Sequence, residues 1–341
     1  MLPAFILGNA RWRFEISGNS YALSLDFSRS IRNLAMVESG SHLDKPAVEW
    51  HFSKMSAEKL NRLQELLLSY QSCLVAYSGG VDSVFLAYVA RTVLGAKSLA
   101  VIADSPSLPR RELAEALEIA SRFEIPVQVV GTKEFDNPAY LANPANRCYF
   151  CKHELFTELE PIARSMGFAV IAYGENASDV GDHRPGAKAA GEFAVRAPLK
   201  EAGLTKAEIR QLSAGFGLPT ADKPQMACLS SRIPYGEPVT PEKLRMIEEA
   251  EWVLRGFGFH DVRVRHHELK VGQLARIEVG LGEMEKLFRD GAFLKVAEGL
   301  KKVGYAHVTL DLLGYRRGSL NETAGIPISL PESPRIPLVP V

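Results

Sequence analysis

The stretch that decides the fold is "CLVAYSGGVDSVFLAYVARTVLG", residues 73–95. Its first five residues are apolar and rich in β-forming side chains, which is typical of a short buried strand. Its last twelve carry apolar residues at helical spacing and end at Gly95, a common C-terminal stop of a helix. Between these two parts lies "SGGVDS", residues 78–83. The stretch therefore predicts a strand that enters a helix through a turn containing two glycines.

The same alternation extends to both sides of this unit. A leucine-rich helix is expected over residues 56–71, and further buried strands are expected over 98–104, 127–131 and 168–173. Helices are expected over 110–123 and 149–166. Apolar strands alternating with helices predict an α/β fold, a doubly wound parallel sheet covered on both faces. Ligands of such a sheet bind at the carboxyl ends of its strands, where the SGGVDS loop stands.

The pattern changes near residue 236. Residues 237–322 alternate helical and half-buried strand patterns and predict a small α+β domain after the α/β domain of residues 55–236. Residues 1–54 show weak patterning, and we interpret them as an N-terminal extension that is either not native or poorly ordered. Residues 323–341 are proline-rich and predict an extended or disordered tail.

The SGGVDS loop carries groups that bind phosphate. Free backbone N–H groups and the helix dipole attract an anion at this point, and the glycines let the backbone approach phosphate oxygens closely. The serine hydroxyls add donors, and the aspartate could hold Mg²⁺ or orient the pyrophosphate. The Gly-Lys-Ser/Thr ending of the Walker A loop is missing. The candidate nucleotide ligands are Ser78, Gly79, Gly80, Val81, Asp82 and Ser83. The alternative is a tight turn with capping serines.

Composition limits the classes of protein. Lys and Arg total 40, and Asp and Glu total 40, so no net field attracts polyanions. No apolar run is long enough to span a membrane, and the apolar start lacks the basic region of a signal peptide. We therefore expect a cytoplasmic protein with neither a nucleic-acid partner nor a membrane partner. Such a compartment keeps thiols reduced.

The segment "NRCYFCKHE", residues 146–154, contains Cys148 and Cys151, two of the four cysteines. Redox switches, zinc knuckles, iron–sulfur ligand pairs and sulfur donors all use this Cys-x-x-Cys spacing. The spacing alone therefore leaves four chemistries open. Because a structural disulfide is disfavoured, both residues are expected to be thiols or metal ligands. Cys73, at the head of the first strand, is expected to be a small buried hydrophobic residue.

The strand–SGGxDS–helix unit resembles the PP-loop ATP pyrophosphatase superfamily, whose members cleave ATP to AMP and pyrophosphate. Asp104, at the end of the second strand, falls where this superfamily often contacts the nucleotide; alternatively, it caps the strand end. Further segments resemble LarE, the ATP-dependent sulfur insertase family that completes the nickel-pincer nucleotide of lactate racemase. These segments are "NRCYFCKHELF", "GENASDVGDHRPGAKAA", "VRAPLKEAGLTKAEIR", "ACLSSRIPYGEPVT", "RVRHH" and "LDLLGYRRGSLNE".

The resemblance to LarE implies a reaction and its participants. That family activates the carboxylates of a pyridinium-3,5-biscarboxylic acid mononucleotide as adenylates and then replaces oxygen by sulfur to give thiocarboxylates. For this chain it implies ATP and Mg²⁺, the small pyridinium mononucleotide as substrate, a homo-oligomer and a sulfide donor.

The same resemblance assigns the cysteines. In family members with one cysteine, the residue at the position of Cys228 gives up its sulfur and becomes dehydroalanine. Members that also carry the Cys-x-x-Cys are thought to hold a [4Fe-4S] cluster, here on Cys148, Cys151 and Cys228. Soft thiolates suit such a cluster, and three ligands leave one iron open for a sulfide. The alternatives are zinc, with His153 as a further ligand, and purely structural cysteines.

Arginines of the "RVRHH" segment form a second group of candidates. Arg263 and Arg265 share one face of the expected strand, since alternate side chains point to the same side. Two guanidinium groups on one face suit a phosphate; the alternative is an exposed basic strand. The resemblance to LarE adds Arg232, Arg276 and Glu278 to the sulfur-transfer site.

In "GENASDVGDHRPG", Asn176, Asp179 and Asp182 could bind ATP or Mg²⁺, or could cap the loop. Glu175 departs from the family, in which a small or hydroxyl residue is more usual at this position. Two rival functions stay open. One is another PP-loop enzyme such as a tRNA thiolase, and the other is a nucleotide-binding or iron–sulfur carrier without turnover.

Overall fold

The computed structural model describes residues 11–16, 19–24, 37–38, 54–179, 185–224, 227–316 and 319–320. Contacts divide the chain into two units, Met1–Asn61 and Arg62–Val341. The first unit contains an antiparallel sheet of three strands: β1 (Arg11–Ile16), β2 (Asn19–Ser24) and β3 (Val37–Glu38). The predicted ligand Asp182, the predicted tail 323–341 and most of the segment 1–54 lie outside the described residues.

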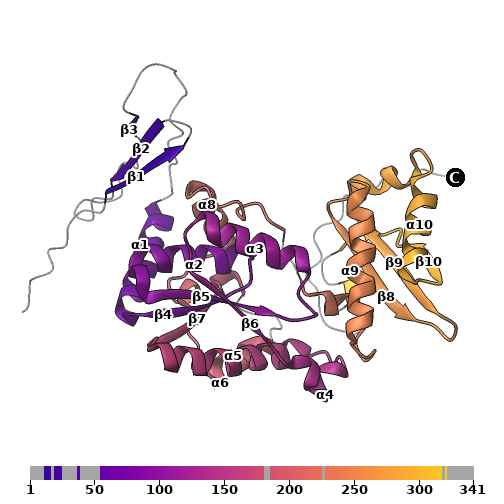
Figure 1. Cartoon of the computed structure of the whole chain (residues 1–341), viewed down its shortest axis with the longest axis horizontal. Coiled ribbons are helices and arrows are strands. Elements are labelled where there is room, and N and C mark those ends of the chain that lie inside the picture. Colours follow the sequence, from indigo (N-terminus) through magenta and orange to yellow (C-terminus); the bar gives the residue numbers. More distant parts are fainter. Residues whose placement is uncertain are drawn as a thin grey trace, which may run out of the picture. The chain divides into compact units, whose positions relative to one another are not determined.

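The larger unit is built on a four-stranded parallel sheet in the order β6-β5-β4-β7 (Figure 1). Its strands are β4 (Cys73–Tyr77), β5 (Ser98–Asp104), β6 (Val127–Gly131) and β7 (Val170–Tyr173). In β4, which has a neighbour on each side, Cys73 and Leu74 are fully buried. Burial on both faces explains why this strand is a continuous apolar run in the sequence. The predicted α/β fold is confirmed.

Helices cover both faces of this sheet. Figure 1 shows α2, α3 and α8 on one face and α5 and α6 on the other. The helices are α1 (Lys54–Tyr70), α2 (Val81–Leu94), α3 (Arg110–Arg122), α4 (Pro138–Leu141), α5 (Arg147–Met166), α6 (Pro185–Glu192), α7 (Pro198–Glu201) and α8 (Lys206–Gly215). Short 3₁₀ turns lie at η1 (Gly95–Lys97), η2 (Glu134–Asp136), η3 (Ala177–Asp179) and η4 (Leu229–Arg232).

Several element boundaries differ from the predictions by a few residues. Helix α1 begins at Lys54 rather than at residue 56, and helix α5 begins at Arg147 rather than at residue 149. Strand β7 begins at Val170 rather than at residue 168, and this difference has a clear cause in the end of α5. Gly167 adopts φ 72°, and the N–H of Phe168 donates to the carbonyl of Ala163 at 2.8 Å. This closing bond keeps Phe168 in the helix-ending turn, so the strand starts later.

The turn between β4 and α2 stands at the switch point of the sheet. From β4 the chain moves to β5 on one side and later returns to β7 on the other side. This reversal leaves a crevice at the carboxyl end of β4. Gly79 in this turn has φ 71°, and a Cβ added to it would lie 2.6 Å from the Cβ of Ala116 in α3. Glycine therefore lets the turn pack directly against α3.

A second, mixed sheet in the order β10-β9-β8 forms a small C-terminal domain. Its elements are α9 (Pro241–Gly256), β8 (Val262–Glu268), β9 (Gln273–Val279), η5 (Leu281–Phe288), α10 (Ala292–Val303) and β10 (His307–Leu310). Strand β9 is antiparallel to β8 and parallel to β10. Leu254, Val264, Ile277 and Leu300 belong to one core shared by helices and strands. A small α+β domain after the α/β domain was predicted and is found; the bounds 55–236 and 237–322 stay predictions.

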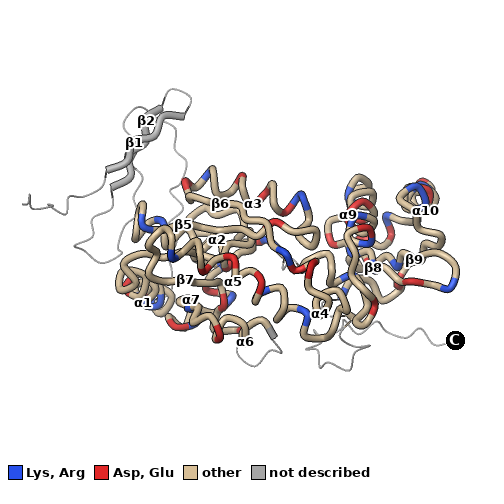
Figure 2. Tube along the Cα trace, turned by 60° about the horizontal axis from the view of Figure 1, so that its bottom comes forward, with Lys and Arg blue, Asp and Glu red and all other residues tan. Residues whose placement is uncertain are grey.

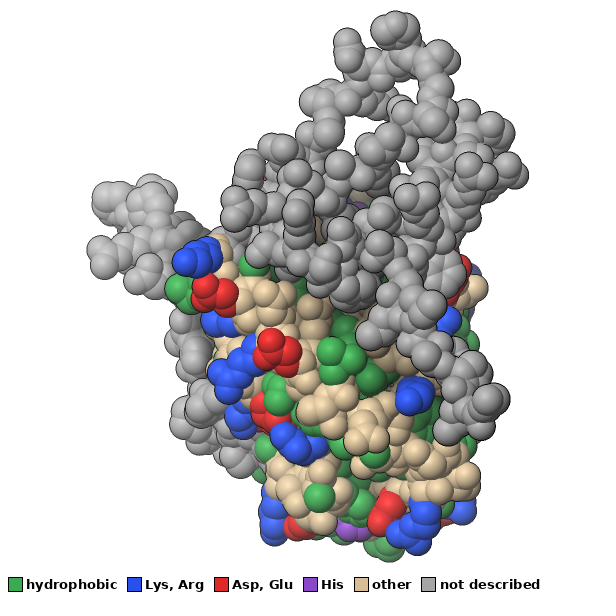
Figure 3. All heavy atoms as spheres, turned by 90° about the vertical axis from the view of Figure 1, so that its left-hand side faces the viewer, with side chains coloured by type: hydrophobic (Ala, Val, Ile, Leu, Met, Phe, Trp, Pro, Cys, Tyr) green, Lys and Arg blue, Asp and Glu red, His purple; other side chains and the backbone are tan. Residues whose placement is uncertain are grey.

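Charges of both signs are interspersed over the described part of the chain. Figure 2 shows Lys and Arg mixed with Asp and Glu along the trace. On the described part of the face in Figure 3, basic, acidic and apolar side chains are likewise mixed. None of the described helices combines the length and the hydrophobicity needed to cross a bilayer. The expected absence of a nucleic-acid partner stays a prediction.

Replacing Gly79 by alanine should destabilise the α/β domain. The new methyl group would clash with Ala116, and the backbone would keep a left-handed φ that alanine rarely adopts. We expect Gly79→Ala to lower the free energy of unfolding by about 2–4 kcal/mol, since overpacking and backbone strain each cost on the order of 1–3 kcal/mol. Urea denaturation followed by circular dichroism measures this loss.

Two glycines serve as matched controls. Gly95 also has a positive φ of 58°, but a Cβ there would meet no atom within 4 Å. Gly95→Ala should therefore show the strain alone, about 1 kcal/mol. Gly80 has φ −84°, and its alanine variant should change stability by less than about 0.5 kcal/mol. A loss for Gly79→Ala no larger than that for Gly95→Ala would contradict the close packing of the turn on α3.

Candidate active site

One large cavity, of about 800 Å³, opens at the carboxyl ends of β4 and β5. Its wall is formed by the β4–α2 turn, by residues that follow β5 and β6, by α5 and α8, and by the segment that carries Cys228. Asp261 and Tyr315 from the small domain also line it. This volume lies within the range of small-molecule sites. The topology thus brings the SGGVDS loop and two of the three predicted sulfur ligands, Cys151 and Cys228, into a single cavity.

Residues of the SGGVDS loop have two roles: some hold the shape of the loop, and others line the cavity. The Ser83 Oγ accepts from the Ser78 N–H at 3.1 Å and donates to the Gly80 carbonyl at 3.1 Å. Ser83 therefore fixes the turn, whereas Ser78, Gly80, Val81 and Asp82 line the cavity. Helix α2 begins at Val81, and the N–H groups of a first turn have no partner within their helix. Such an end is a site for an anion.

Basic side chains from separate segments line the same cavity. The Lys206 Nζ lies 2.5 Å from a carboxylate oxygen of Asp82. Lys223, whose side chain is 9% exposed, pairs with Glu112 at 2.7 Å and donates to the Gly79 carbonyl at 3.3 Å. Lys152 and Arg210 complete the set of cations in the wall. Sequence analysis did not single out any of these four basic residues as candidates.

Of the polar residues predicted for the nucleotide site, Asn176 and Asp179 lie near Asp82 of the SGGVDS loop, whereas Asp104 has a separate partner. Asn176 donates to Asp82 at 3.4 Å, and the N–H of Asn176 donates to the carboxylate of Asp179 at 3.1 Å. Asp179 lines the cavity. Asp104 instead pairs with Arg110 at 2.5 Å and is not among the described residues of the cavity wall. The structure therefore groups Asn176 and Asp179 with Asp82 and leaves Asp104 outside.

The three cysteines of the predicted sulfur site come from two segments. Cys228 immediately precedes η4, and Cys148 and Cys151 lie on the first turns of α5. Cys151 and Cys228 line the cavity, whereas Cys148 is exposed. Desolvation raises the pKa of Cys151, and Cys228 and Cys148 are among the neighbours that raise it further. The three sulfurs are therefore electrostatic neighbours.

Arg147 supplies a buried positive charge to this group. Its Nη2 lies 4.0 Å from the Cys228 Sγ, and its Nη1 donates to the Ser230 carbonyl at 3.1 Å and to the Asn143 side chain. Burial opposes the charge of Arg147, but Cys228 and Cys148 outweigh it and raise the Arg147 pKa. A cation in this position stabilises thiolates. Cys73 lies elsewhere, buried in β4, where desolvation raises its pKa to about 12. The prediction that Cys73 is a buried apolar residue is confirmed.

The cysteines do not form a site for a single metal ion. Within the described residues, no three His, Cys, Asp or Glu side chains converge to hold one ion. The His153 ring instead packs edge-on against Phe193, with centroids 5.0 Å apart, and lies 5.8 Å from the Tyr149 ring. Two residues beyond Cys151, it occupies another face of α5. This arrangement argues against the alternative of a zinc site that includes His153.

The predicted arginines gather behind the Cys228 segment. Arg232, which is fully buried, pairs with Glu251 at 2.8 Å and donates to the carbonyls of Ala227 and Cys228 at 2.6 and 3.0 Å. Arg265 donates to the Ser231 carbonyl at 2.9 Å. Arg232 and Arg265 thus hold the backbone on which Cys228 is carried.

The other members of this group lie on β8 and β9. Glu278 pairs with Arg265 at 2.7 Å and with Arg276 at 3.1 Å. The Arg263 guanidinium lies 4.8 Å from the centre of the Tyr315 ring, which lines the cavity. None of the five predicted residues Arg232, Arg263, Arg265, Arg276 and Glu278 belongs to the cavity wall in the described structure. They form a layer behind it.

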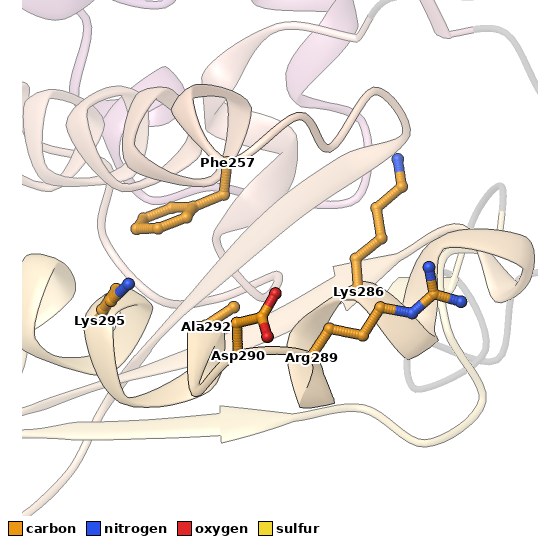
Figure 4. A pocket seen from close by; sticks show the side chains of 6 residues that line it. All are labelled: Phe257, Lys286, Arg289, Asp290, Ala292 and Lys295. Carbon is orange, nitrogen blue, oxygen red and sulfur yellow. The ribbon is translucent and has the colours of Figure 1, made fainter.

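A second pocket, of about 250 Å³, lies on the small domain away from these motifs (Figure 4). Lys286, Arg289, Lys295 and Asp290 surround it with Phe257 and Ala292. Lys286 already pairs with Glu283 at 2.7 Å, and Arg289 pairs with Glu285 at 2.9 Å. Two of its four charged side chains therefore already have partners among the described residues.

No protein-family model matches the chain, but curated proteins are similar to it over 78% of its length. An uncharacterized protein of Synechocystis sp. is 43% identical over 267 residues, which cover 98% of that protein. The pyridinium-3,5-bisthiocarboxylic acid mononucleotide synthase of Lactiplantibacillus plantarum is 34% identical over 272 residues, 95% of its length. An uncharacterized protein of Methanocaldococcus jannaschii is 25% identical over 265 residues, 98% of its length.

Removing the charge of Glu251 should destabilise the domain strongly, because it leaves Arg232 buried without a counter-charge. We expect Glu251→Gln to lower the free energy of unfolding by about 3 kcal/mol, measured by urea denaturation at pH 7. Burial would raise the pKa of Glu251, but Arg232 outweighs burial and holds the pKa below its ordinary value of 4.5. The wild-type advantage should therefore be complete above pH 4.5 and shrink as the pH falls through the lowered pKa.

Glu249, two residues away on α9, is the matched control. It pairs with Arg245 at 2.8 Å, but the two side chains are 44% and 61% exposed. Glu249→Gln should change stability by less than about 0.5 kcal/mol. Equal losses of unfolding free energy in the two variants would show that the buried pair stabilises the domain no more than the exposed pair does.

Proposed function

The chain belongs to the LarE-type family of pyridinium-3,5-bisthiocarboxylic acid mononucleotide synthases, and from this premise we propose that it is an ATP-dependent sulfur transferase. Its substrate is pyridinium-3,5-biscarboxylic acid mononucleotide, and its product is the bisthiocarboxylic acid form. Each carboxylate is first activated as an adenylate, and sulfur then replaces an oxygen atom. The name of the Lactiplantibacillus plantarum relative supports this substrate class.

One observation carries the proposal: the SGGVDS loop and Cys228 line the same cavity. An adenylate made at the loop can therefore meet a sulfur nucleophile without leaving the protein. A carrier without turnover would not need to place a phosphate-binding loop and a thiol in one cavity. The shared cavity therefore favours an enzyme over this rival.

In the adenylation step, a substrate carboxylate oxygen attacks the α-phosphorus of ATP, and the bond to pyrophosphate breaks. The first-turn N–H groups of α2, together with Lys206 and Lys223, stabilise the negative charge that develops on the leaving pyrophosphate. Asp82 and Asp179 carry the oxygen ligands that Mg²⁺ prefers, and the ion, when bound, would neutralise part of the phosphate charge.

In the sulfur step, a sulfur nucleophile attacks the acyl carbon of the adenylate. A carbon–sulfur bond forms, the carbon–oxygen bond to AMP breaks, and AMP leaves. Cys228 stands in the cavity wall, with Arg147 beside it to hold negative charge on sulfur. Arg232 and Arg265 fix the backbone of this segment, and Arg263, Arg276 and Glu278 support it from β8 and β9.

A [4Fe-4S] cluster fits the donor set at this place. Each cysteine of such a cluster binds a different iron, so the sulfurs need to surround a common space rather than converge on one ion. Cys148, Cys151 and Cys228 are electrostatic neighbours, and Arg147 would offset the negative charge of their thiolates in a cluster. When bound, the cluster would supply an iron with an open position for a sulfide. Delivery of that sulfide requires a donor, and we place the enzyme in the cytoplasm as a homo-oligomer.

A second sulfur source is Cys228 itself, which would be consumed: after its Sγ has bonded to the acyl carbon, the Cβ–Sγ bond breaks with loss of the Cα proton, and dehydroalanine remains at position 228. The place of Cys228 in the cavity wall favours this alternative, since Cys148 is exposed and is not among the described wall residues. The tRNA thiolase alternative would need a basic face for RNA, whereas charges of both signs are mixed over the described chain.

Mg-ATP and the biscarboxylate substrate should yield AMP and pyrophosphate, and Asp82→Asn should depress this yield. Loss of a preorganised phosphate or metal contact costs on the order of a hundredfold in rate. Chromatography of the nucleotides and a pyrophosphate assay measure the products. Asp222→Asn is the control, because Asp222 is an exposed acid next to Lys223. Formation of ADP and phosphate would contradict the PP-loop chemistry.

The source of sulfur can be tested with Cys148→Ala. If all three cysteines hold a cluster, this variant should form AMP normally but lose sulfur transfer, because the cluster loses a ligand. Anaerobic wild-type protein should contain iron and sulfide and should keep its full mass through repeated turnovers. Cys73→Ala, the same change in a cysteine outside the cavity, should keep sulfur transfer. Dehydroalanine at position 228, with Cys148→Ala still active, would instead establish Cys228 as the donor.

A further inference from the structure

Glu134 is a buried acid in the cavity wall to which no role has yet been assigned. It lies on the short turn η2, and it is 2% exposed. Its Oε1 accepts a long hydrogen bond of 3.4 Å from the Ser107 hydroxyl. Its Oε2 has no hydrogen-bond partner among the described residues. A carboxylate in this state lacks the partners that normally compensate its burial.

No ion pair joins Glu134 to any described residue, although Lys152 lines the same cavity. The charge of Glu134 contributes to the raised pKa of Cys151. The buried cation Arg147 donates to Asn143 and Ser230 and lies against Cys228. The described structure therefore gives Glu134 no direct counter-ion.

Glu134 stands at the sulfur end of the cavity. Ser107, its hydrogen-bond partner, accepts at its carbonyl from the N–H of Leu229 at 2.8 Å, and Leu229 directly follows Cys228. In the proposed substrate, each reacting carboxyl carbon is attached directly to the pyridinium ring. A carboxyl group that meets sulfur at this end therefore brings the ring, and its fixed positive charge, within one ring width of the sulfur.

We propose that Glu134 is the counter-ion that recognises the positively charged ring of the mononucleotide. The interaction is electrostatic, since a ring nitrogen bonded to ribose has no hydrogen to donate. It selects an aromatic cation over a neutral ring of the same shape, and it offsets the burial of the unpartnered carboxylate oxygen. This inference rests on the proposed function and assigns its substrate specificity to one residue.

The test compares two ligands and two proteins by calorimetry on the full chain. The ligands are pyridinium-3,5-biscarboxylic acid mononucleotide and its neutral analogue, in which a benzene ring replaces the pyridinium ring. Glu134→Gln should weaken binding of the charged ligand about tenfold or more, because the loss of one charge–charge interaction of modest strength is enough to lower the affinity tenfold. Binding of the neutral analogue and of ATP should stay within about twofold.

Two further variants sharpen the result. Asp136→Asn removes an exposed charge from the same turn and should change neither affinity. Glu134→Asp keeps the charge and should keep the preference for the charged ring, even if it binds both ligands less tightly. Equal weakening of both ligands by Glu134→Gln would overturn the proposal and give Glu134 a structural role. Unchanged affinity for both ligands would overturn it as well.

The outcomes also separate this inference from the proposed function. If wild-type protein binds the charged ligand and Glu134→Gln binds it equally well, only the counter-ion assignment fails. If wild-type protein binds ATP but neither mononucleotide, the proposed substrate is wrong, and the assignment falls with it. Weakened binding of ATP in Glu134→Gln, with the charged ligand unaffected, would place Glu134 in the nucleotide site and reject the assignment.

Discussion

The ion pair between Arg232 and Glu251 fixes the position of the segment that carries Cys228. Burying two charges is unfavourable unless their remaining polar atoms are satisfied. Here Arg232 also donates to the carbonyls of Ala227 and Cys228, and Glu251 accepts from the N–H of Val264 at 3.3 Å. One closed network thus joins α9 and β8 of the small domain to the segment that carries Cys228. The two domains build one cavity because this network holds their shared wall.

The cavity has two ends of different electrostatic character. At the SGGVDS end, the first turn of α2 is accompanied by lysines such as Lys206 and Lys223, an environment that suits a polyanion. At the other end lie Cys151, Cys228 and the unpartnered Glu134 oxygen, together with the buried cation Arg147 beside Cys228. In our proposal, the groups of the substrate that react with ATP face the first end, and its positively charged ring faces Glu134 at the second. The difference between the two ends would then orient the substrate before any chemistry occurs.

The fold could be predicted because its decisive features are local. Buried parallel strands are continuous apolar runs, and the SGGVDS loop with its flanking strand and helix lies within a few consecutive residues. Lys206, Lys223 and Glu134 could not be found in this way, since each is an ordinary residue in its own segment and gains meaning only when the sheet brings the segments together. The ion pair of Asp104 with Arg110 in the next helix was likewise not visible in the sequence. The role of Asp104 as a nucleotide ligand stays a prediction.

Cys148 and Cys151 belong to one helix, whereas Cys228 follows β7, α6, α7 and α8 along the chain. The proposed sulfur site thus joins residues that are far apart in the sequence, and closing it requires ordering a long intervening chain. During synthesis the two thiols of α5 emerge first and spend a period without their third partner. In our proposal, the α/β domain must therefore fold before the three thiols can bind a cluster together. A defect in the folding of that domain would then appear as a loss of the cluster.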